Sequence, residues 1–352
     1  MDHPEKNRPL LQAKHLRKTF LLQSTSFGDF LNRFTLKGKD SKTIVKAIND
    51  VSMTVNHREI VGLVGESGSG KTTLARLLLR LLSPDLNDKE PPSQIWFDGE
   101  EIIHLSRRQM RRRRAKMRMM FQHPESALNP FLRIREILTE SIEMYDSSSS
   151  LAREDLLESL LTSVRLPNVL EQYPRDLSGG QQRRISILRT LVGKPKLIVA
   201  DEPVASLDAS IQAQIIDLIR EISETQQIAF LLISHNLSLV LSLSHRVMVM
   251  YGGHIVETGQ KKEILEAVVH PYTIDLWQSA NYDLDRMRQR NRSPLRQELS
   301  EDGCRYRPHC RLYELLTTPD QGQCAQELPP LRHISNGHSV ACHHFEQSVE
   351  IG

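Results

Sequence analysis

Hydrophobic and polar positions alternate along the chain between short apolar runs and longer helical stretches. Residues 11–62 are rich in strand-forming runs, and the polar segment 23–43 among them predicts an inserted loop. Further along, short apolar runs predict strands, and the first of them is expected to be buried. These runs are Ile60–Val64, Gln94–Phe97, Leu197–Ala200, Ile228–Ile233 and Val247–Met250. Strands alternating with helices are typical of an α/β protein with a parallel sheet.

The helical stretches suggest how the chain is divided. One follows residue 70 and runs to Leu82, and another spans Ala209–Ser223. Between them, the pattern from about residue 126 to 195 is helical, with helices expected at Ile134–Met144 and Leu151–Val164 and a serine-rich loop, Ser147–Ser150, joining them. After His270-Pro271-Tyr272 the composition changes. We therefore expect one domain at 1–270, with a helical subdomain at about 124–195, and a C-terminal extension at 271–352.

Composition and charge narrow the class of protein. The 352 residues carry 46 Lys and Arg against 43 Asp and Glu, and the net charge of +3 excludes a polycation or a strongly acidic disordered tail. No stretch approaches the roughly 18 uncharged apolar residues of a membrane span. The first residues contain no apolar signal-peptide core. We expect a soluble, cytosolic protein whose link to a membrane is made through a partner.

A phosphate-binding loop follows the apolar run Ile60–Val64. Its spacing is Gly-x4-Gly-Lys-Thr, with a strand before it and a helix after it. The glycines let backbone N–H groups close around phosphate oxygens, and the helix N-terminus adds partial positive charge. Lys71 is expected to reach the β- and γ-phosphates and the Thr72 hydroxyl to bind Mg²⁺. The expected nucleotide-binding residues here are Gly65, Glu66, Ser67, Gly68, Ser69, Gly70, Lys71, Thr72 and Thr73.

Two acidic residues follow the apolar run Leu197–Ala200. Asp201 is expected to hold the Mg²⁺ shell, directly or through water, and Glu202 to polarise an attacking water. A strand followed by two acids can also be an ordinary helix N-terminus. Its position downstream of a phosphate-binding loop favours the catalytic interpretation. The two motifs together do not choose among kinases, GTPases, helicases and transporters.

A third motif makes that choice. The segment Leu177 to Gln181 reads LSGGQ, and here the chain resembles the ABC ATPase family, whose signature motif this is. The serine hydroxyl, the glycine amides and a helix start form a second anion site, which is compatible with a helix N-cap at Ser178. The resemblance implies that this motif caps the ATP held by the opposite subunit, so that hydrolysis requires a dimer. The residues concerned are Ser178, Gly179, Gly180 and Gln181.

The remaining family positions match one by one. The resemblance makes Gln122 the glutamine that senses Mg²⁺ and nucleotide and faces the transmembrane partner, Asp208 the D-loop aspartate and His235 the switch histidine at the γ-phosphate. The family usually has Asp where this chain has Asn236. Phe20 aligns with the aromatic residue that stacks on adenine, although a strand phenylalanine is more often part of a core.

The resemblance defines the expected fold and site. It implies an α/β P-loop NTPase core with an antiparallel β subdomain and a helical subdomain. The catalytic set is then Glu202, His235 and Gln122, and the Mg²⁺ ligands are Thr72, Gln122 and Asp201.

The C-terminal extension resembles that of the oligopeptide and dipeptide permease ATPases. The resemblance rests on His270-Pro271-Tyr272-Thr273 and on a Gly-Cys-x5-Cys element, and it spans nearly the whole chain. All four cysteines lie in the extension, although more residues separate the second from the third than is common in the subfamily. They are Cys304, Cys310, Cys324 and Cys342.

Three interpretations of the cysteines stay open. Disulfides are not expected in a cytosolic protein, and the spacing lacks the close pairs that are usual in zinc sites. Four thiolates suit a 4Fe–4S cluster, which some members of this subfamily carry. Zinc is the second interpretation, and reduced thiols without a metal are the third.

Residues 106–118 form a basic run of seven Arg and one Lys without an acidic residue. No aromatic residue lies between the charges, so nucleic-acid binding is not expected. A solvated helix face, partly near lipid headgroups or the permease, is the better interpretation.

The function implied by the resemblance is ATP hydrolysis in an importer of dipeptides or oligopeptides, with ATP and Mg²⁺ as cofactors. The implied partners are a second, related ATPase subunit, two transmembrane permease subunits and a solute-binding protein outside the membrane. The chain would then lie at the cytoplasmic face of the inner membrane as a peripheral protein. Other solutes, such as nickel chelates, are alternatives. A non-transport ABC ATPase would carry tandem nucleotide domains or a long coiled-coil insertion, which this sequence does not contain.

Overall fold

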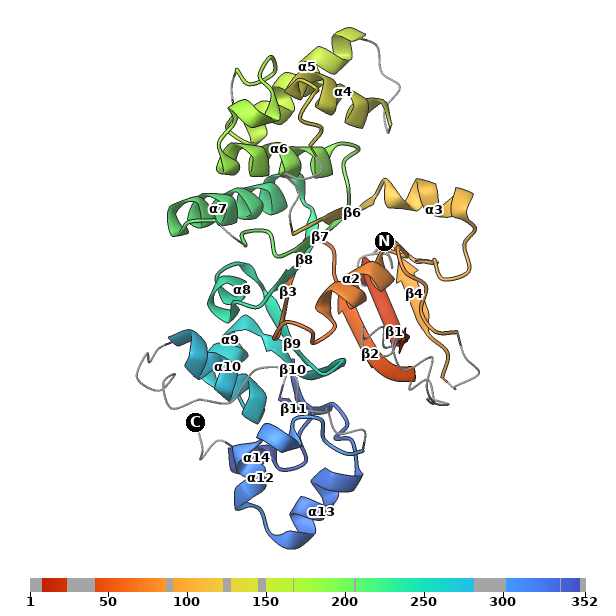
Figure 1. The fold of residues 1–352 in the computed structure, drawn as a ribbon, viewed down its shortest axis with the longest axis vertical. Helices are drawn as coiled ribbons and strands as arrows, with labels where there is room; N and C mark the ends of the chain where they lie inside the picture. The colour runs from red at the N-terminus through yellow and green to blue at the C-terminus, as the bar shows by residue number, and fades with distance from the viewer. Residues whose placement is uncertain are drawn as a thin grey trace, which may run out of the picture.

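Two sheets and the helices around them organise the molecule (Figure 1). This computed structural model describes residues 8–23, 42–86, 91–122, 128–144, 150–166, 168–205, 207–281, 302–335 and 337–348. The smaller sheet has four strands in the order β2-β1-β4-β5, and the larger has eight in the order β11-β12-β10-β9-β3-β8-β7-β6.

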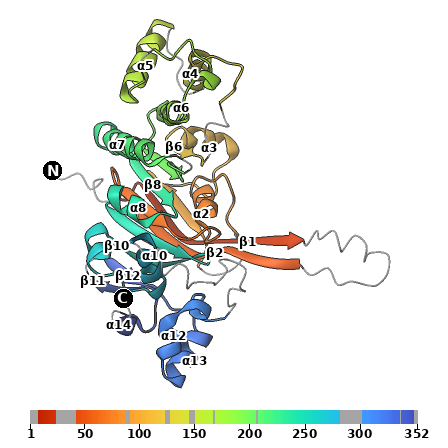
Figure 2. The ribbon, with the colours of Figure 1, turned by 60° about the vertical axis from the view of Figure 1, so that its left-hand side comes forward.

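The four-stranded sheet is antiparallel throughout. β1 (Leu11–Gln23) pairs along its length with β2 (Lys42–Val55), and this long hairpin projects from the body in Figure 2. β4 (Gln94–Phe97) lies on the other side of β1 and pairs with β5 (Glu100–Glu101). The apolar runs near residues 45 and 53 thus belong to one strand, in which shifts of register let the paired strands bend. Most of the loop expected at 23–43 lies outside the described residues.

The eight-stranded sheet confirms the expected parallel α/β core. Five neighbouring strands are parallel: β6 (Met117–Met120), β7 (Leu197–Asp201), β8 (Ala229–Ser234), β3 (Ile60–Val64) and β9 (Arg246–Tyr251). Every residue of β3, β7 and β8 is buried, since both faces of a parallel sheet are covered, and this is why their sequences are continuous apolar runs. Three antiparallel strands extend the sheet: β10 (His254–Gln260), β12 (His338–Val340) and β11 (Arg332–Ser335).

Side chains on alternating positions of this sheet form two separate cores. Val61 and Leu63 of β3 face the β subdomain and helix α2, whereas Ile60 and Val64 face the remaining helices. The helices before the extension are α2 (Lys71–Leu78), α3 (Arg107–Arg114), α4 (Ile134–Glu143), α5 (Ser150–Ser163), the 3-10 helix η3 (Pro174–Asp176), α6 (Gly179–Leu191), α7 (Ala209–Gln226), α8 (Leu237–Leu243) and α9 (Lys261–Glu266). Helices α4 to α6, in the region where a helical subdomain is expected, lie together at the top of Figure 1. None of the described helices is long and apolar enough to cross a bilayer.

Two expected elements have different limits. The helix expected to reach Leu82 ends at Leu78, because Arg80 takes a left-handed conformation with a φ of 52°. The N–H of Arg80 donates a hydrogen bond to Leu77 O, and the N–H of Leu81 donates one to Arg76 O. These two bonds are the Schellman pattern of helix termination. The basic run does not form one helix face, since α3 ends at Arg114 and β6 begins three residues later.

The C-terminal extension is joined to the large sheet. It contains α10 (Pro271–Asn281), the 3-10 helix η4 (Arg307–His309), α12 (Arg311–Leu315), α13 (Thr318–Gln326), β11, β12 and α14 (Phe345–Ser348). The expected boundary at 270 coincides with the start of α10, but β12 pairs with β10, with Val340 opposite Glu257. The extension therefore continues the eight-stranded sheet.

Candidate active site

The expected phosphate-binding loop connects β3 to α2 and is held between two strands. Gly70 has a φ of 108°, and a Cβ atom there would lie 2.5 Å from Ala47 O of β2. A Cβ on Gly65 would collide with Met250 O of β9. Glycine is therefore required at both ends of the loop, where strands of both sheets approach its backbone.

Lys71 folds back over this loop. Its Nζ donates hydrogen bonds to Gly65 O at 2.6 Å and to Glu66 O at 2.8 Å. Burial lowers the pKa of Lys71, while Glu202 and Asp201 act in the opposite direction. The buried Ser69 hydroxyl has no hydrogen-bond partner among the described residues. The loop thus presents a buried cation and an unpaired hydroxyl, which fit the charge and the acceptor oxygens of a phosphate.

The expected Mg²⁺ ligands Asp201 and Thr72 lie together. Asp201 ends β7 and is 5% exposed, and burial raises its pKa, while a hydrogen bond from the Thr72 side chain lowers it. A carboxylate paired with a hydroxyl beside a phosphate-binding loop is the donor set that Mg²⁺ prefers in P-loop NTPases. The carboxylate of Asp201 and the hydroxyl of Thr72 are therefore suitable ligands for Mg²⁺.

Glu202 and His235 come from the ends of neighbouring strands and are in direct contact. Glu202 has a φ of 51°, and its N–H bonds to Ile233 O at the end of β8. Its Oε1 accepts a hydrogen bond from the backbone N–H of His235 at 3.0 Å, and Ser234 Oγ lies 3.2 Å from its Oε2. The His235 ring is 66% exposed, so it is open to a ligand. Asn236, the departure from the family pattern, caps α8 by accepting from Leu239 N–H at 3.0 Å, as an aspartate could.

Arg183, which the sequence analysis missed, joins three of the expected motifs. It lies on α6, two residues after the LSGGQ segment, and is 2% exposed. Its guanidinium donates to Gln122 O at 2.9 Å, to Pro203 O at 2.6 Å and to Glu202 O at 2.8 Å. The available signal was an arginine one and two helical turns before the buried Ile187 and Leu191, because a charge on the buried side of a helix requires partners.

The LSGGQ segment forms an exposed helix start in another part of the molecule from the phosphate-binding loop (Figure 1). Ser178 is the N-cap of α6 and accepts from Gln181 N–H at 3.3 Å, while Gln181 Oε1 accepts from Ser178 N–H at 2.9 Å. Gly180 packs on Ile211 of α7, whereas Gly179 has nothing within 4 Å of a Cβ position. No described hydrogen bond joins this segment to the loop of the same chain.

Three further expected residues have different surroundings. Asp208 caps α7 by accepting from Ser210 and Ile211 N–H, both at 3.0 Å, and these bonds lower its pKa. Gln122 follows β6 and is exposed. Phe20 lies half-exposed on β1, with Lys18 Nζ 5.7 Å from the centre of its ring, and so belongs to neither core.

The four cysteines line one cavity of about 20 Å³ in the extension, together with His343 and His344. Burial, and to a smaller extent the neighbouring cysteines, raises the thiol pKa to about 12 for both Cys310 and Cys342. Gly303 must be glycine, since its φ is 72° and a Cβ there would lie 2.5 Å from Ala325 O. Among the residues that the structure describes, no group of three or more His, Cys, Asp or Glu has the geometry of a metal site.

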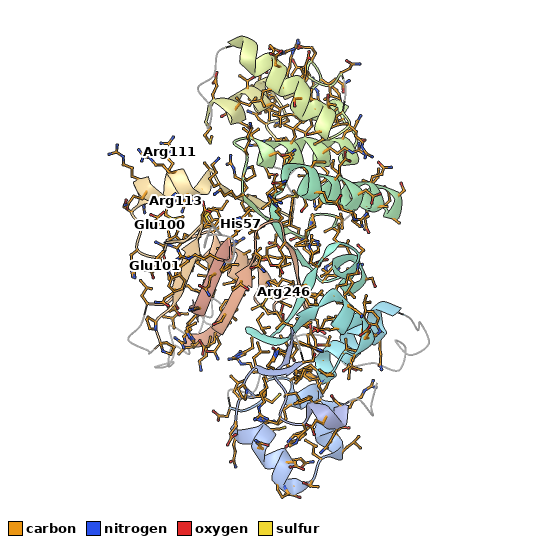
Figure 3. The ribbon with its side chains drawn as sticks, turned by 180° about the vertical axis from the view of Figure 1, so that it is seen from behind. His57, Glu100, Glu101, Arg111, Arg113 and Arg246 are labelled. Carbon is orange, nitrogen blue, oxygen red and sulfur yellow. The ribbon has the colours of Figure 1, made fainter. Side chains whose placement is uncertain are left out.

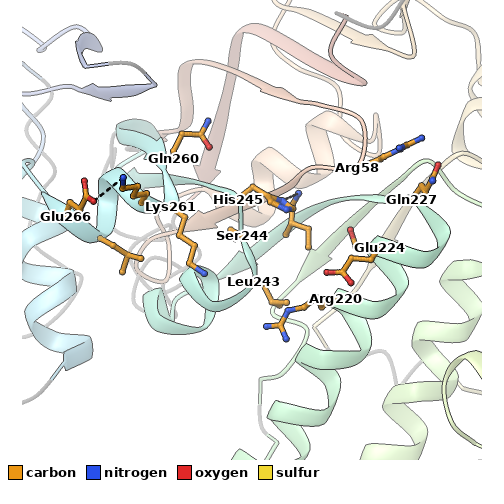
Figure 4. A pocket seen from close by; sticks show the side chains of 14 residues that line it. Arg58, Arg220, Glu224, Gln227, Leu243, Ser244, His245, Gln260, Lys261 and Glu266 are labelled. Atoms are coloured by element: carbon orange, nitrogen blue, oxygen red, sulfur yellow. Dashed lines mark hydrogen bonds and ion pairs between the residues drawn. The ribbon is translucent and has the colours of Figure 1, made fainter.

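A cavity of about 910 Å³ lies away from this chemistry (Figure 4). It is open and is lined by residues from α7, α9 and the turns beside them. Its charged side chains have both signs, with Arg58, Arg220 and Lys261 against Glu224 and Glu266. These side chains do not gather around one point where a substrate could bind, so the cavity is not the active site.

Comparison with known proteins identifies the class. A family model described as ABC transporter matches residues 48–205, and one described as oligopeptide/dipeptide transporter, C-terminal region, matches residues 256–314. The chain belongs to the ATP-binding proteins of ABC transporters and is an ATPase of that class. Within it, the chain belongs to the branch that carries the oligopeptide/dipeptide C-terminal region.

Two curated relatives cover most of the chain. It is 39% identical over 311 residues to the probable peptide ABC transporter ATP-binding protein y4tS of Sinorhizobium fredii, covering 87% of this chain and 84% of that one. It is 37% identical over 307 residues to the oligopeptide transport ATP-binding protein AppF of Bacillus subtilis, covering 85% and 89%.

Solved structures show the same fold. The chain resembles a dimeric ABC cassette, MJ0796, bound to ADP and Pi, with a TM-score of 0.57 and 23% identity over 71% of this chain and 98% of that one. It resembles cbiO1 of Clostridium perfringens with a TM-score of 0.60 and 21% identity, over 79% and 97%. The expected ABC ATPase fold is confirmed.

Proposed function

We propose that this chain hydrolyses ATP at the site between β3, β7 and β8 and so drives a peptide importer. The observation that carries the proposal is the contact between Glu202 and His235 beside the phosphate-binding loop. Lys71 and the loop amides bind the phosphates, Thr72 and Asp201 hold Mg²⁺, and Glu202 orients and deprotonates the attacking water. Mg²⁺ supplies charge neutralisation at the β- and γ-phosphates.

The exposed LSGGQ segment supports a site completed by a second ATPase subunit. Ser178 and Gly179 are exposed at a helix start and do not contact the loop of their own chain. A helix start with free space around a glycine suits a phosphate approaching from outside. The proposed partner is a second, related ATP-binding subunit, and Asp208 and Gln122 would lie near the shared nucleotides.

Exposed aromatic side chains just before Gln122 and nine residues after it in the sequence support docking of a permease. Phe121 is 49% exposed and Phe131 is 83% exposed, and exposed aromatic residues at such a site suit a protein interface. The proposed partners are two transmembrane permease subunits and a solute-binding protein outside the membrane.

Helix α3 supports a position at an anionic membrane surface. Arg107, Arg108, Arg111 and Arg112 are exposed and share one face, while Met110 on the opposite face is buried. Arg111 points away from the sheet in Figure 3, whereas Arg113 lies against Glu100. A cationic helix face suits the headgroups of the cytoplasmic leaflet, so the proposed location is the cytoplasmic face of the inner membrane, as a peripheral protein.

Reconstitution of the complete importer tests the proposed function. The chain is tagged, its membrane complex is isolated and its subunits are identified by mass spectrometry. The complex in liposomes should then accumulate labelled di- and oligopeptides in the presence of ATP, and not in the presence of a non-hydrolysable analogue. A complex that hydrolyses ATP but accumulates a nickel chelate in place of any peptide would contradict the peptide assignment.

We propose that the four cysteines of the extension form a metal–sulfur site when a metal is bound, although their arrangement without one does not have the geometry of a metal site. Cys304, Cys310, Cys324 and Cys342 line one enclosed space and carry no disulfide, and four thiolates can hold a 4Fe–4S cluster, with zinc as the second candidate. Protein purified without oxygen should absorb near ~400 nm and lose this absorbance in Cys304→Ser. Stoichiometric zinc without iron would identify zinc as the bound metal. Protein that contains neither iron nor zinc would contradict both proposals.

A further inference from the structure

The C-terminal extension contacts the phosphate-binding loop directly. Tyr272, near the start of α10, is 2% exposed, and its hydroxyl accepts a hydrogen bond from the backbone N–H of Glu66 at 2.8 Å. Lys71 Nζ donates to the carbonyl of the same residue at 2.8 Å. Glu66 is therefore held at its N–H by the extension and at its carbonyl by the lysine that reaches the phosphates.

The Tyr272 side chain has little freedom to move. Its own N–H donates to His270 Nδ1 at 3.0 Å, and its ring packs against those of Tyr251 and Tyr306, with centroids 4.7 and 5.4 Å away. Tyr306 in turn donates a hydrogen bond to Asp275 of α10. The hydroxyl is thus held in place by aromatic packing from β9 and from the cysteine-bearing segment.

A second contact reaches the other end of the loop. Arg305 donates from Nη1 to Gly252 O at 2.6 Å, and the N–H of the next residue, Gly253, donates to Ser69 O at 2.9 Å. Gly253 has a φ of 84°, a conformation that few other residues adopt, and its carbonyl accepts from Asn49 N–H at 3.0 Å. The extension therefore fixes the turn on which the buried end of the loop rests.

We propose that Tyr272 and Arg305 are positioning residues for ATP, so that the extension is part of the nucleotide site. They act through Glu66 and Ser69 and set the loop conformation in which Lys71 and the loop amides meet the triphosphate. This inference rests on the proposed ATP hydrolysis. Pre-organisation of a loop lowers the free energy spent on ordering it when a ligand binds.

The test uses the intact transporter complex in lipid nanodiscs and measures ATP turnover. Tyr272→Phe keeps the buried ring and removes only the hydroxyl. We expect the KM for ATP to rise about five- to tenfold, the equivalent of one lost hydrogen bond, with kcat changed less than about twofold. Arg305→Gln should raise the KM in the same direction.

Tyr313→Phe is the matched control, since it removes a tyrosine hydroxyl of the extension for which no hydrogen bond is found among the described residues. Its KM should stay at the wild-type value. A purely structural role for Tyr272 would lower the melting temperature and leave the KM for ATP unchanged. That result in Tyr272→Phe, together with an unchanged KM in Arg305→Gln, would overturn the proposal.

Binding of a fluorescent ATP analogue keeps the two proposals distinguishable. If the wild-type complex bound the analogue but did not hydrolyse ATP, the proposed function would fail. The positioning role would then be decided by whether Tyr272→Phe and Arg305→Gln weaken binding of the analogue. Equal affinity in wild type and both variants would contradict the positioning role.

Discussion

The Glu202 carboxylate and the His235 ring are joined at one oxygen, since Nδ1 of His235 lies 2.8 Å from Oε1 of Glu202. The backbone N–H of His235 donates to the same oxygen at 3.0 Å. The contact holds the carboxylate against the end of β8 and leaves the rest of the exposed imidazole free. One residue therefore orients the proposed base and faces the place where a γ-phosphate would bind.

Replacement of the base is the first prediction. Glu202→Gln keeps the shape of the side chain and removes its capacity to accept a proton, so ATP turnover should fall at least about 100-fold. ATP binding should remain, and an ATP-bound dimer should accumulate on size-exclusion chromatography. Ordinary turnover by the assembled complex carrying Glu202→Gln would rule out this role for Glu202.

Arg183 carries the second prediction. Arg183→Met leaves the carbonyls of Gln122, Pro203 and Glu202 without their donor, and we expect a loss of about 2–4 kcal/mol in unfolding free energy, measured by denaturant titration. Arg175→Met, at an arginine whose side chain is 71% exposed, is the control and should change stability by less than about 0.5 kcal/mol. Equal stability of the two variants would show that the Arg183 contacts contribute nothing measurable.

The continuous apolar runs made the parallel strands predictable from the sequence. In β3, β7 and β8 every position is buried, so local composition and burial agree. The loop Gly65–Thr73 was also recognisable, and contacts with Met250 and Ala47 explain why glycine is required at its two ends, Gly65 and Gly70.

Elements defined by distant partners were not predictable. β6 lies beside a cationic helix in the sequence, and its four residues become a strand only by pairing with β7. β12 is a strand because it pairs with β10, about eighty residues earlier in the chain. The contact between Tyr272 and Glu66 joins residues whose spacing carries no signal of its own. Tertiary pairing decided these features, and local pattern could not reveal it.

Helix α3 predicts salt-sensitive attachment to anionic membranes. The full chain should sediment with vesicles that contain phosphatidylglycerol, and the fraction bound should fall as NaCl rises from ~0.05 to ~0.5 M, since the attraction is screened. Replacing Arg107, Arg108, Arg111 and Arg112 by Gln should abolish sedimentation. The control replaces the exposed Arg58, Arg175, Lys262 and Arg332 in the same way and should still sediment. Equal binding to neutral phosphatidylcholine vesicles would contradict the electrostatic interpretation.

His254 predicts a loss of stability in mild acid. Burial, and then the charge of Arg305, lower its pKa from 6.5 to about 4, so the folded protein keeps the ring neutral while the unfolded chain takes up a proton. Stability from this group is complete above pH 6.5 and is lost as the pH falls towards 4, by on the order of 3 kcal/mol. His254→Gln can still accept the hydrogen bond from Asn49 and does not titrate, so its melting temperature should decline less over this interval. Melting temperatures that fall equally with pH in wild type and variant would contradict the assignment of this acid sensitivity to His254.

Gly303 should be essential to the cysteine cavity, because the backbone of α13 closes directly over it. Gly303→Ala would drive a methyl group into the carbonyls of Cys324 and Ala325 at a φ that alanine rarely adopts, so we expect a loss of about 2–4 kcal/mol or local unfolding of the extension. Gly322→Ala is the control within α13, where nothing lies within 4 Å of a Cβ, and it should raise stability by up to about 1 kcal/mol. The rate at which the four thiols react with Ellman's reagent measures the outcome. It should rise in Gly303→Ala and stay at the wild-type value in Gly322→Ala, and equally protected thiols in both would contradict the requirement for glycine.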